Sequence, residues 1–220
     1  MTTLQIADPL AMKDLAAFTS LAHRLDGDGA MRIQVSSTVL VLTVAPLYPH
    51  GIGDSTPLVL AMRMLRLTGP EMDGFDEVVP LSTLKDRFAR EENHTSLPVP
   101  PNSVLVSWTG IAPPKGNWER RDVVTGASLR STAEAGIEEI SQGAPEGAGS
   151  HAVKALRSRV WSKPMAGIEG TEVPGGLAFA ADALRFVPPT AQASRYELFE
   201  SAGWLRLATP GGHLLTRAKR

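Results

Sequence analysis

The sequence predicts an α+β fold, and three kinds of pattern support this. Apolar residues spaced three and four positions apart, typical of helices, occur in both halves of the chain. Alternating or continuous apolar runs, typical of strands, lie between them, and the C-terminal end has the pattern of a β-meander. We expect a mixed helix and strand part over about 1–122, and a part with three helices and a β-meander over about 123–220. Whether the two parts share one core stays open.

The composition excludes several classes of protein. The 220 residues carry 22 basic and 23 acidic side chains, a formal net charge of −1, and no cysteine. This balance is neither that of a disordered chain nor that of a nucleic-acid coat, and without cysteine there are no disulfides or thiolate sites. No apolar run approaches the roughly 20 residues of a membrane span, and the N-terminus has no secretory pattern. We therefore expect a cytoplasmic protein without membrane contact.

The first helix and two strands are the clearest elements. Asp8 is a good N-cap and Pro9 suits the first helical position, so a helix with one apolar stripe is predicted from there to Gly27. Residues 31–35 alternate between apolar and polar, as in a half-buried strand, and residues 39–44 are apolar on both faces, as in a central strand. The pattern leaves open whether these form one bent strand or a tight hairpin.

The next segment is harder to assign. Residues 46–57 have the composition of a loop, and the apolar run 58–67 fits either a helix or a buried strand. Proline before it, Gly-Pro after it and its Leu, Met, Ala and Arg content favour a helix. A short strand at 78–79 and a helix from Ser82 to about Glu92 are expected to follow.

The remaining elements follow from turn signals and periodicity. We expect a proline-rich loop over 93–102, a strand over 104–108, a polar turn over 115–118 and a linker over 143–150. The expected helices and strands of the C-terminal part are helices 127–142, 151–162 and 177–187 and strands 196–199, 204–208 and 214–216.

A serine hydrolase is the first alternative function, suggested by the loop 53–57. The loop overlaps the G-x-S-x-G pattern, with proline in place of the last glycine. It also resembles the Gly-Asp-Ser block of the GDSL-type esterases, which implies Ser55 as nucleophile, with His50 and Asp54 as candidate partners. None of the five histidines follows an aspartate by three positions, so the Asp-x-x-His pair of those esterases is missing. A capped turn at Asp54 or Thr56 is the simpler interpretation, and no catalytic site is expected.

Metal and cofactor sites are not predicted. The pair His50 and Asp54 has no second histidine nearby, and the other four histidines are scattered along the sequence. Neither of the glycine-rich phosphate-binding patterns occurs between a strand and a helix. We expect no metal and no cofactor.

A loop that combines cations and tryptophan is the leading candidate for a contact surface. Lys115, Trp118, Arg120 and Arg121 follow Trp108 within a short stretch. Such a loop can hold an anion, a nucleotide base or a partner peptide, because Trp and Arg are enriched at binding hot spots. The alternative is a turn whose tryptophans pack against the core.

DNA binding is the second alternative. Three expected helices precede a hairpin, as in winged-helix domains, and the stretch from Lys154 to Lys163 is basic. A helix-turn-helix motif needs a turn of about three or four residues, whereas the connections here are longer, and the net charge is near zero. We therefore do not expect a nucleic-acid partner.

Several short blocks carry a resemblance to a known group of sequences. The blocks are Val99-Pro100-Pro101, Ser107-Trp108-Thr109-Gly110, Pro113-Pro114 before Trp118, and Trp204-Leu205-Arg206-Leu207 before Gly212-His213. On these blocks the chain resembles a family of uncharacterised actinobacterial proteins, and its 16 arginines against 6 lysines agree with such a source. The resemblance implies no activity.

The predicted function is a non-catalytic interaction or ligand-binding protein. The expected partner is a protein or a small molecule of unknown identity, contacted around Trp108 and Trp118. A homodimer is expected from the frequency of such assemblies alone.

Overall fold

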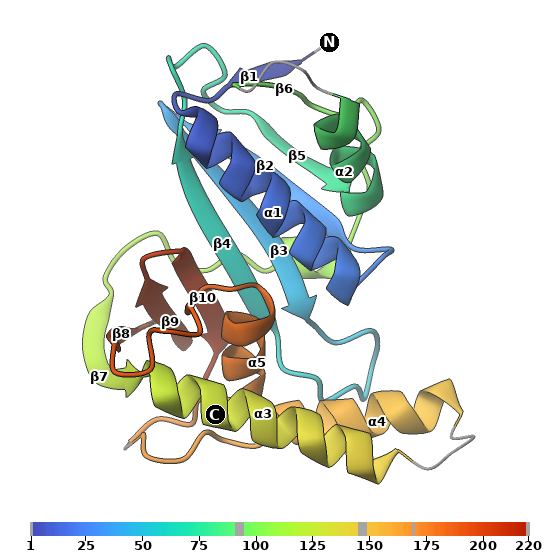
Figure 1. Cartoon of the computed structure of the whole chain (residues 1–220), viewed down its shortest axis with the longest axis vertical. Helices are drawn as coiled ribbons and strands as arrows, with labels where there is room; N and C mark the ends of the chain where they lie inside the picture. Colours follow the sequence, from blue (N-terminus) through green and yellow to red (C-terminus); the bar gives the residue numbers. More distant parts are fainter. Residues whose placement is uncertain (1, 91–94, 145–148, 169, 219–220) are drawn as a thin grey trace. The chain divides into compact units, whose positions relative to one another are not determined.

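The computed structural model describes residues 2–90, 95–144, 149–168 and 170–218. It confirms a mixed α+β fold and divides into two compact units (Figure 1). The first unit comprises residues 1–46 and 62–110, and the second comprises residues 47–61 and 111–220. Residues 47–61 therefore belong with the C-terminal half of the sequence, which the sequence patterns do not indicate.

The first unit contains two antiparallel sheets. In the larger one the strand order is β5-β2-β3-β4, and in the smaller one β1 pairs with β6. The strands are β1 (Thr3–Gln5), β2 (Ala30–Ser36), β3 (Val39–Leu47), β4 (Val59–Arg66), β5 (Asp76–Pro80) and β6 (Ser96–Pro98). The last residue of β3 and the first three residues of β4 belong to the second unit. The helices are α1 (Pro9–Leu25), α2 (Leu81–Arg90) and the short 3-10 helix η1 (Ser107–Gly110).

Helix α1 forms as its sequence predicts. The Asp8 carboxylate accepts a hydrogen bond from the Leu10 N–H at 2.9 Å, and proline occupies the first helical position. The apolar stripe of the helix is buried, with Leu15 and Phe18 at 0% exposure. Arg63 of β4 forms an ion pair with Asp14 and lies 5.0 Å from the Phe18 ring centroid. These contacts fix α1 against the sheet that it crosses in Figure 1.

The segment 30–47 is a tight hairpin, which settles the question that the sequence left open. Ser36 pairs with Val39, so only two residues connect β2 and β3. Ser37 adopts a φ of 55°, the positive value that short hairpin turns require. Its backbone N–H donates to the Asp73 carboxylate at 2.7 Å, which stabilises the turn.

The strand β4 occupies Val59–Arg66, so the prediction of a helix over residues 58–67 is wrong. Val59, Leu60 and Ala61 are at most 2% exposed, because β4 is buried on both faces at this end. A strand buried on both faces has a continuous apolar sequence, and pairing with β3 outweighs the local helix preference of Leu, Met and Ala.

The strand predicted over 104–108 is also wrong, and two short strands were missed. Val104 donates one backbone hydrogen bond to Val78 of β5, after which the chain tightens into η1 and leaves Leu105 fully exposed. Strands β1 and β6 have three residues each, too few for a periodic pattern. Helix α2 begins at Leu81, one residue before the expected cap, and its predicted end near Glu92 lies outside the described residues.

The second unit contains four strands that pair antiparallel with one another, and three helices. The strand order is β10-β9-β8-β7. The strands are β7 (Glu119–Thr125), β8 (Arg195–Ser201), β9 (Trp204–Thr209) and β10 (Gly212–Arg217), and the helices are α3 (Gly126–Gly143), α4 (Ser150–Trp161) and α5 (Gly175–Ala183). The three helices and the meander β8-β9-β10 confirm the elements predicted here, with α5 ending earlier than expected. Residues 145–148 of the predicted linker lie outside the described part of the chain.

Strand β7 was not predicted, because four charged residues begin it. It is an edge strand of the sheet, where charged side chains remain in water. On one face of the sheet, Leu198, Leu207 and Leu214 lie opposite one another and have 0% exposure. Helices α3 and α5 contact β7 and β10, so we place the helices on this leucine face.

Candidate functional site

Asp54 organises the loop that suggested a hydrolase. Its carboxylate accepts hydrogen bonds from the His50 N–H (2.9 Å), from the Thr56 N–H (2.9 Å) and hydroxyl (2.6 Å), and from the Ser158 hydroxyl (3.4 Å). An aspartate that accepts from the N–H two residues ahead forms an Asx turn. Burial alone would raise the pKa of Asp54, but these hydrogen bonds lower it to about 2. Asp54 is therefore an ionised anchor of this loop.

Ser55 lies against α4 and not against a histidine. Its hydroxyl shares a 2.9 Å hydrogen bond with the Ser158 hydroxyl, and its carbonyl oxygen accepts from the Ser162 hydroxyl at 2.7 Å. The His50 ring packs on the Tyr48 ring, with centroids 4.3 Å apart. Among the described residues, Ser55 has no base as a hydrogen-bond partner, so this arrangement does not support the esterase alternative. Nothing in the sequence indicates that Ser158 and Ser162 fix this loop.

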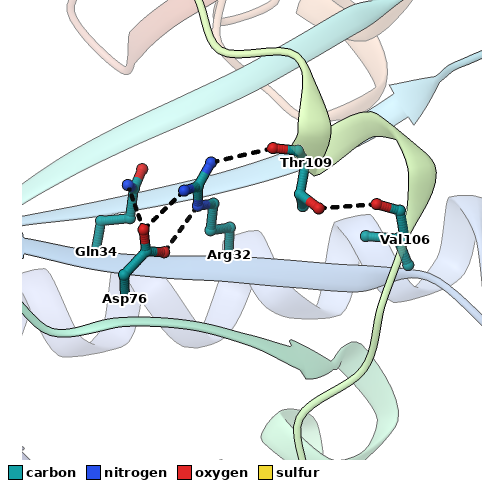
Figure 2. A network of polar contacts seen from close by, with 5 residues as sticks. All are labelled: Arg32, Gln34, Asp76, Val106 and Thr109. Atoms are coloured by element: carbon teal, nitrogen blue, oxygen red, sulfur yellow. Dashed lines mark hydrogen bonds and ion pairs between the residues drawn. The ribbon is translucent and has the colours of Figure 1, made fainter.

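A second polar network lies in the first unit and surrounds the segment of Trp108. Figure 2 shows the Asp76 carboxylate facing Arg32 and Gln34, with two bonds from the guanidinium at 2.7 and 2.8 Å and one from the amide at 3.0 Å. The hydrogen bond between them raises the pKa of Arg32 and lowers that of Asp76. Both groups are therefore charged over the ordinary pH range.

The same arginine holds the segment of η1. A third nitrogen of Arg32 donates to the Thr109 carbonyl at 3.4 Å, and the Thr109 hydroxyl donates to the Val106 carbonyl at 2.8 Å (Figure 2). Trp108 lies in this segment and is only 4% exposed. The network thus has a structural explanation, and the Trp108 side chain packs into the first unit.

Trp118 and two strand residues form a layered cluster on the second unit. The Arg206 guanidinium of β9 lies 4.6 Å from the Trp118 ring centroid and 4.8 Å from the Phe199 ring centroid. Arg120, Phe199 and Arg206 lie opposite one another in the β7-β8-β9 register, so they share a face. Arg120 pairs with Glu197 of this face at 3.2 Å. We name the set Trp118, Arg120, Glu197, Phe199, Arg206 and His213 the Trp118 surface.

The other predicted contact residues lie elsewhere. Arg121 forms ion pairs with Glu200 at 2.8 Å and with Glu119 at 3.7 Å. Glu200 alternates with Phe199 along β8, so Arg121 lies on the opposite face, after a bulge in β7. Lys115 is exposed in a segment that the Ser201 hydroxyl fixes by donating to the Gly116 carbonyl at 2.9 Å.

Sequence reasoning missed Phe199, Arg206 and His213 as members of the surface. The available signal was the alternation in the last strands, because Arg206 stands between two leucines that are 0% exposed. In a strand with one buried face, the residues between the buried ones lie on the other face. Only the tertiary contact of Arg206 with the Trp118 ring shows that Trp118 meets this face.

The winged-helix alternative is wrong for this fold. Residues 175–181 of α5 are all buried, so this helix has no face to place in a DNA groove. The C-terminal hairpin β9-β10 is part of a larger sheet, because β9 pairs with β8 and β8 pairs with β7, and it is not a separate wing. The basic side chains Lys154, Arg157 and Arg159 of α4 are exposed.

Two searches of the described residues concern other kinds of site. No three histidine, aspartate or glutamate side chains gather there in a way that could hold a metal ion. No helix in the described ranges combines the length and the apolar character that crossing a membrane demands.

Comparison with solved structures finds DNA polymerase III beta subunits and sliding clamps. The pol III beta protein of Caulobacter crescentus matches with a TM-score of 0.52 at 11% identity, and the Helicobacter pylori beta clamp with 0.52 at 5% identity. The sliding clamp of Pseudomonas aeruginosa matches with 0.50 at 11% identity. The match covers 99%, 100% and 99% of this chain but only 65%, 63% and 63% of those chains, respectively. At these identities the likeness is one of fold.

Comparison with protein families gives two matches, and comparison with curated proteins gives none. Residues 113–220 match a domain of unknown function, DUF8185. Residues 1–110 match a second domain of unknown function, DUF8010. The expectation of an uncharacterised family is thereby confirmed, while the actinobacterial origin stays a prediction. Since its model matches half of the chain, the protein belongs to the DUF8010 family of domains of unknown function.

Proposed function

We propose that this chain is a non-catalytic interaction protein and that the Trp118 surface contacts its partner. The observation that carries the proposal is the position of the Arg206 guanidinium over both the Trp118 and the Phe199 ring, 4.6 and 4.8 Å from their centroids. Tryptophan and arginine are the residues most enriched at binding hot spots. Stacking holds both side chains in place before a partner arrives, which lowers the entropy cost of binding.

The proposed partner is another protein. Small-molecule sites are concave and enclose most of the ligand. The Trp118 surface spreads over four strands, which suits the broader contact area of a protein. The hydroxyl at Ser55 and the carboxylate at Asp54, the candidate reactive groups, are engaged in fixing a loop.

The likeness to solved structures supports the same class of function. The matching proteins with TM-scores of at least 0.5 include proteins named as a polymerase III beta protein and as a polymerase sliding clamp. Those names describe components of an assembly. We propose that the present fold likewise serves assembly, with a partner or with a second copy of itself.

The test compares the whole chain with three single variants as bait in extracts of the source organism. Trp118→Ala and Arg120→Ala alter the Trp118 surface, whereas Arg121→Ala alters the opposite face and is the matched control. Truncating a hot-spot residue costs about 2 kcal/mol, roughly 30-fold in Kd. We expect Trp118→Ala to reduce by about that factor the binding of a partner identified by mass spectrometry and then purified. A partner bound equally by all three variants would contradict the proposal.

Self-assembly is measured separately, by light scattering of the purified chain over a range of concentrations. A dimer that Trp118→Ala dissociates and Arg121→Ala does not would identify the partner as a second copy. A dimer unaffected by either variant would assign self-assembly to another surface.

A further inference from the structure

We infer that Arg206 and His213 bind a carboxylate, supplied by an acidic segment of the partner protein. This inference rests on the proposed function and adds the chemistry of the group that docks on the Trp118 surface. It follows from three features of the surface: the enclosure of Arg206, the position of His213 beside it, and the charge balance around both.

Arg206 is a half-buried cation without a counter-ion among the described residues. Its Nε is enclosed and has no hydrogen-bond partner there, and no carboxylate of the described chain forms an ion pair with it. Its neighbour Arg120 differs, because it pairs with Glu197 at 3.2 Å. A charge removed from water is costly when no opposite charge compensates it. The two aromatic rings compensate part of that cost, because each lies within cation–π distance of the guanidinium.

His213 lies next to Arg206 on the same face. Arg206 pairs with Leu215 and His213 pairs with Ala208, so the two are diagonal neighbours across β9 and β10, within reach of long side chains. The His213 Nδ1 is enclosed and has no partner among the described residues. Burial, and then the charge of Arg206, lowers the pKa of His213, which keeps the ring neutral near pH 7. A neutral imidazole next to an uncompensated guanidinium accommodates an incoming anion.

We expect the anion to contact the outer nitrogens of each group. Both side chains are partly exposed, and the terminal nitrogens of Arg206 and the Nε2 of His213 are not among the buried atoms that lack a hydrogen-bond partner. A guanidinium presents its N–H groups in a fixed fork that matches the two oxygens of a carboxylate. The contacts with the two rings and the burial of the Nε restrict the Arg206 side chain, which lowers the entropy cost of binding.

The charge balance favours a protein carboxylate over the phosphates of a nucleic acid. Arg120 and Glu197 neutralise each other, which leaves one uncompensated positive charge, Arg206, on the Trp118 surface. A nucleic acid gains its affinity from several phosphate contacts at once and would here face Glu197. One carboxylate, with apolar neighbours against Trp118 and Phe199, matches both the charge and the rings.

The first experiment uses the unaltered whole chain and NMR of the arginine Nε–H and histidine ring signals. Sodium acetate is titrated against sodium chloride at constant ionic strength, followed by an acetylated hexaglutamate amide and its hexaglutamine counterpart. We expect saturable shifts of the Arg206 and His213 signals with acetate and hexaglutamate, and none with hexaglutamine. Shifts no larger than those with chloride would overturn the inference.

The second experiment assigns the binding to Arg206. Losing a hydrogen-bonded charge weakens hexaglutamate binding roughly 10- to 100-fold, so R206Q should show that loss and R121Q should not. Thermal unfolding of each variant verifies that it is folded. If R206Q does not fold, the NMR titration of the unaltered chain remains the test of the inference. A DNA duplex that binds through Arg206 more tightly than hexaglutamate would overturn the carboxylate assignment.

The two proposals fail in different ways. If acetate and hexaglutamate cause no NMR shifts but the Trp118→Ala variant still loses partner binding, the carboxylate site is refuted. The proposed contact surface is then still supported. Saturable carboxylate binding at Arg206, with a partner insensitive to Trp118→Ala, would refute the proposed contact surface.

Discussion

At the scale of single residues, hydrogen-bond partners separate structural groups from groups that are available for function. Asp54 and Ser55 have the residue types of a reactive site, yet each forms hydrogen bonds within the loop or with α4. Arg206 shows no such feature in the sequence, and it is a half-buried cation whose enclosed Nε has no hydrogen-bond partner among the described residues. A polar side chain that already forms its hydrogen bonds within the protein gains little free energy from a new hydrogen bond to a ligand.

The first prediction concerns the stability contributed by Asp54. Its pKa falls from an ordinary 3.8 to about 2 on folding, so ionised Asp54 stabilises the folded state above about pH 4. That contribution is lost as the pH falls through about 2. Asp54→Ala should cost about 1–2 kcal/mol at neutral pH, the usual value of such a capping carboxylate. Urea unfolding of both proteins from pH 7 to pH 2 measures the difference.

The expected outcome is a difference between the two proteins that is constant at neutral pH and shrinks towards pH 2. A difference that is independent of pH over the whole range would contradict the assignment of Asp54 as an ionised anchor.

At the scale of elements, the helices of the second unit pack through one small residue. A Cβ atom at Gly136 of α3 would lie 2.3 Å from the Trp161 ring, closer than any real contact. Trp161 ends α4 and stacks on Phe179 of α5 with centroids 4.6 Å apart, so its ring has neighbours on both helices. The contact of the three helices therefore depends on the absence of a side chain at Gly136.

The second prediction is that Gly136→Ala destabilises the protein despite the better helix propensity of alanine. Overpacking of a close contact costs about 1–3 kcal/mol, whereas the propensity gain is about 1 kcal/mol. Thermal unfolding should show a net loss. Gly51→Ala, where a Cβ would meet nothing within 4 Å, is the control and should change stability little. Stabilisation by Gly136→Ala would show that Trp161 moves aside at no cost.

At the scale of the whole molecule, the boundaries of the families and of the compact units differ. The family matches divide the chain between residues 110 and 113, whereas residues 47–61 belong to the second compact unit. Within that unit, the Thr216 hydroxyl donates to the Leu58 carbonyl at 2.8 Å, and Ser158 and Ser162 bind Ser55. A cut between the two family matches would remove these contacts. The boundary near residue 122 expected from the sequence stays a prediction.

The third prediction follows from this arrangement. A fragment of residues 111–220 lacks residues 47–61, so it should unfold at a lower temperature than the second unit of the intact chain. A synthetic peptide of residues 47–61 should raise its melting temperature, because a ligand that binds only the folded state stabilises it. Circular dichroism melts with and without the peptide, and with a scrambled peptide as control, measure the effect. A fragment as stable as the intact chain would contradict the division into units.

The correct predictions from sequence depend on contacts between residues close together in the sequence. The incorrect ones depend on contacts between residues far apart in the sequence. Helix α1 was predicted because its cap, its proline and its apolar stripe all act within a few turns. Strand β4 was predicted as a helix, and β7 was not predicted, because pairing with another strand decided both. For the candidate surface, Trp118 and Arg120 were identified from residue types. Phe199 and Arg206 were not, because they come from strands some eighty residues away in sequence.

The sequence by itself determined the α+β class, the ends of the well-capped helices, the three C-terminal strands and the membership of a family without known activity. Each of these depends on local periodicity, caps or residue content. The tertiary structure alone decided that the Ser55 loop is anchored to α4, that Trp108 is buried, and that Trp118 stacks on Arg206. The physical reason is that the neighbours of a side chain decide whether its hydrogen bonds and charge are already paired within the protein or remain available to bind a partner. In a sheet with long connections, those neighbours come from distant parts of the chain.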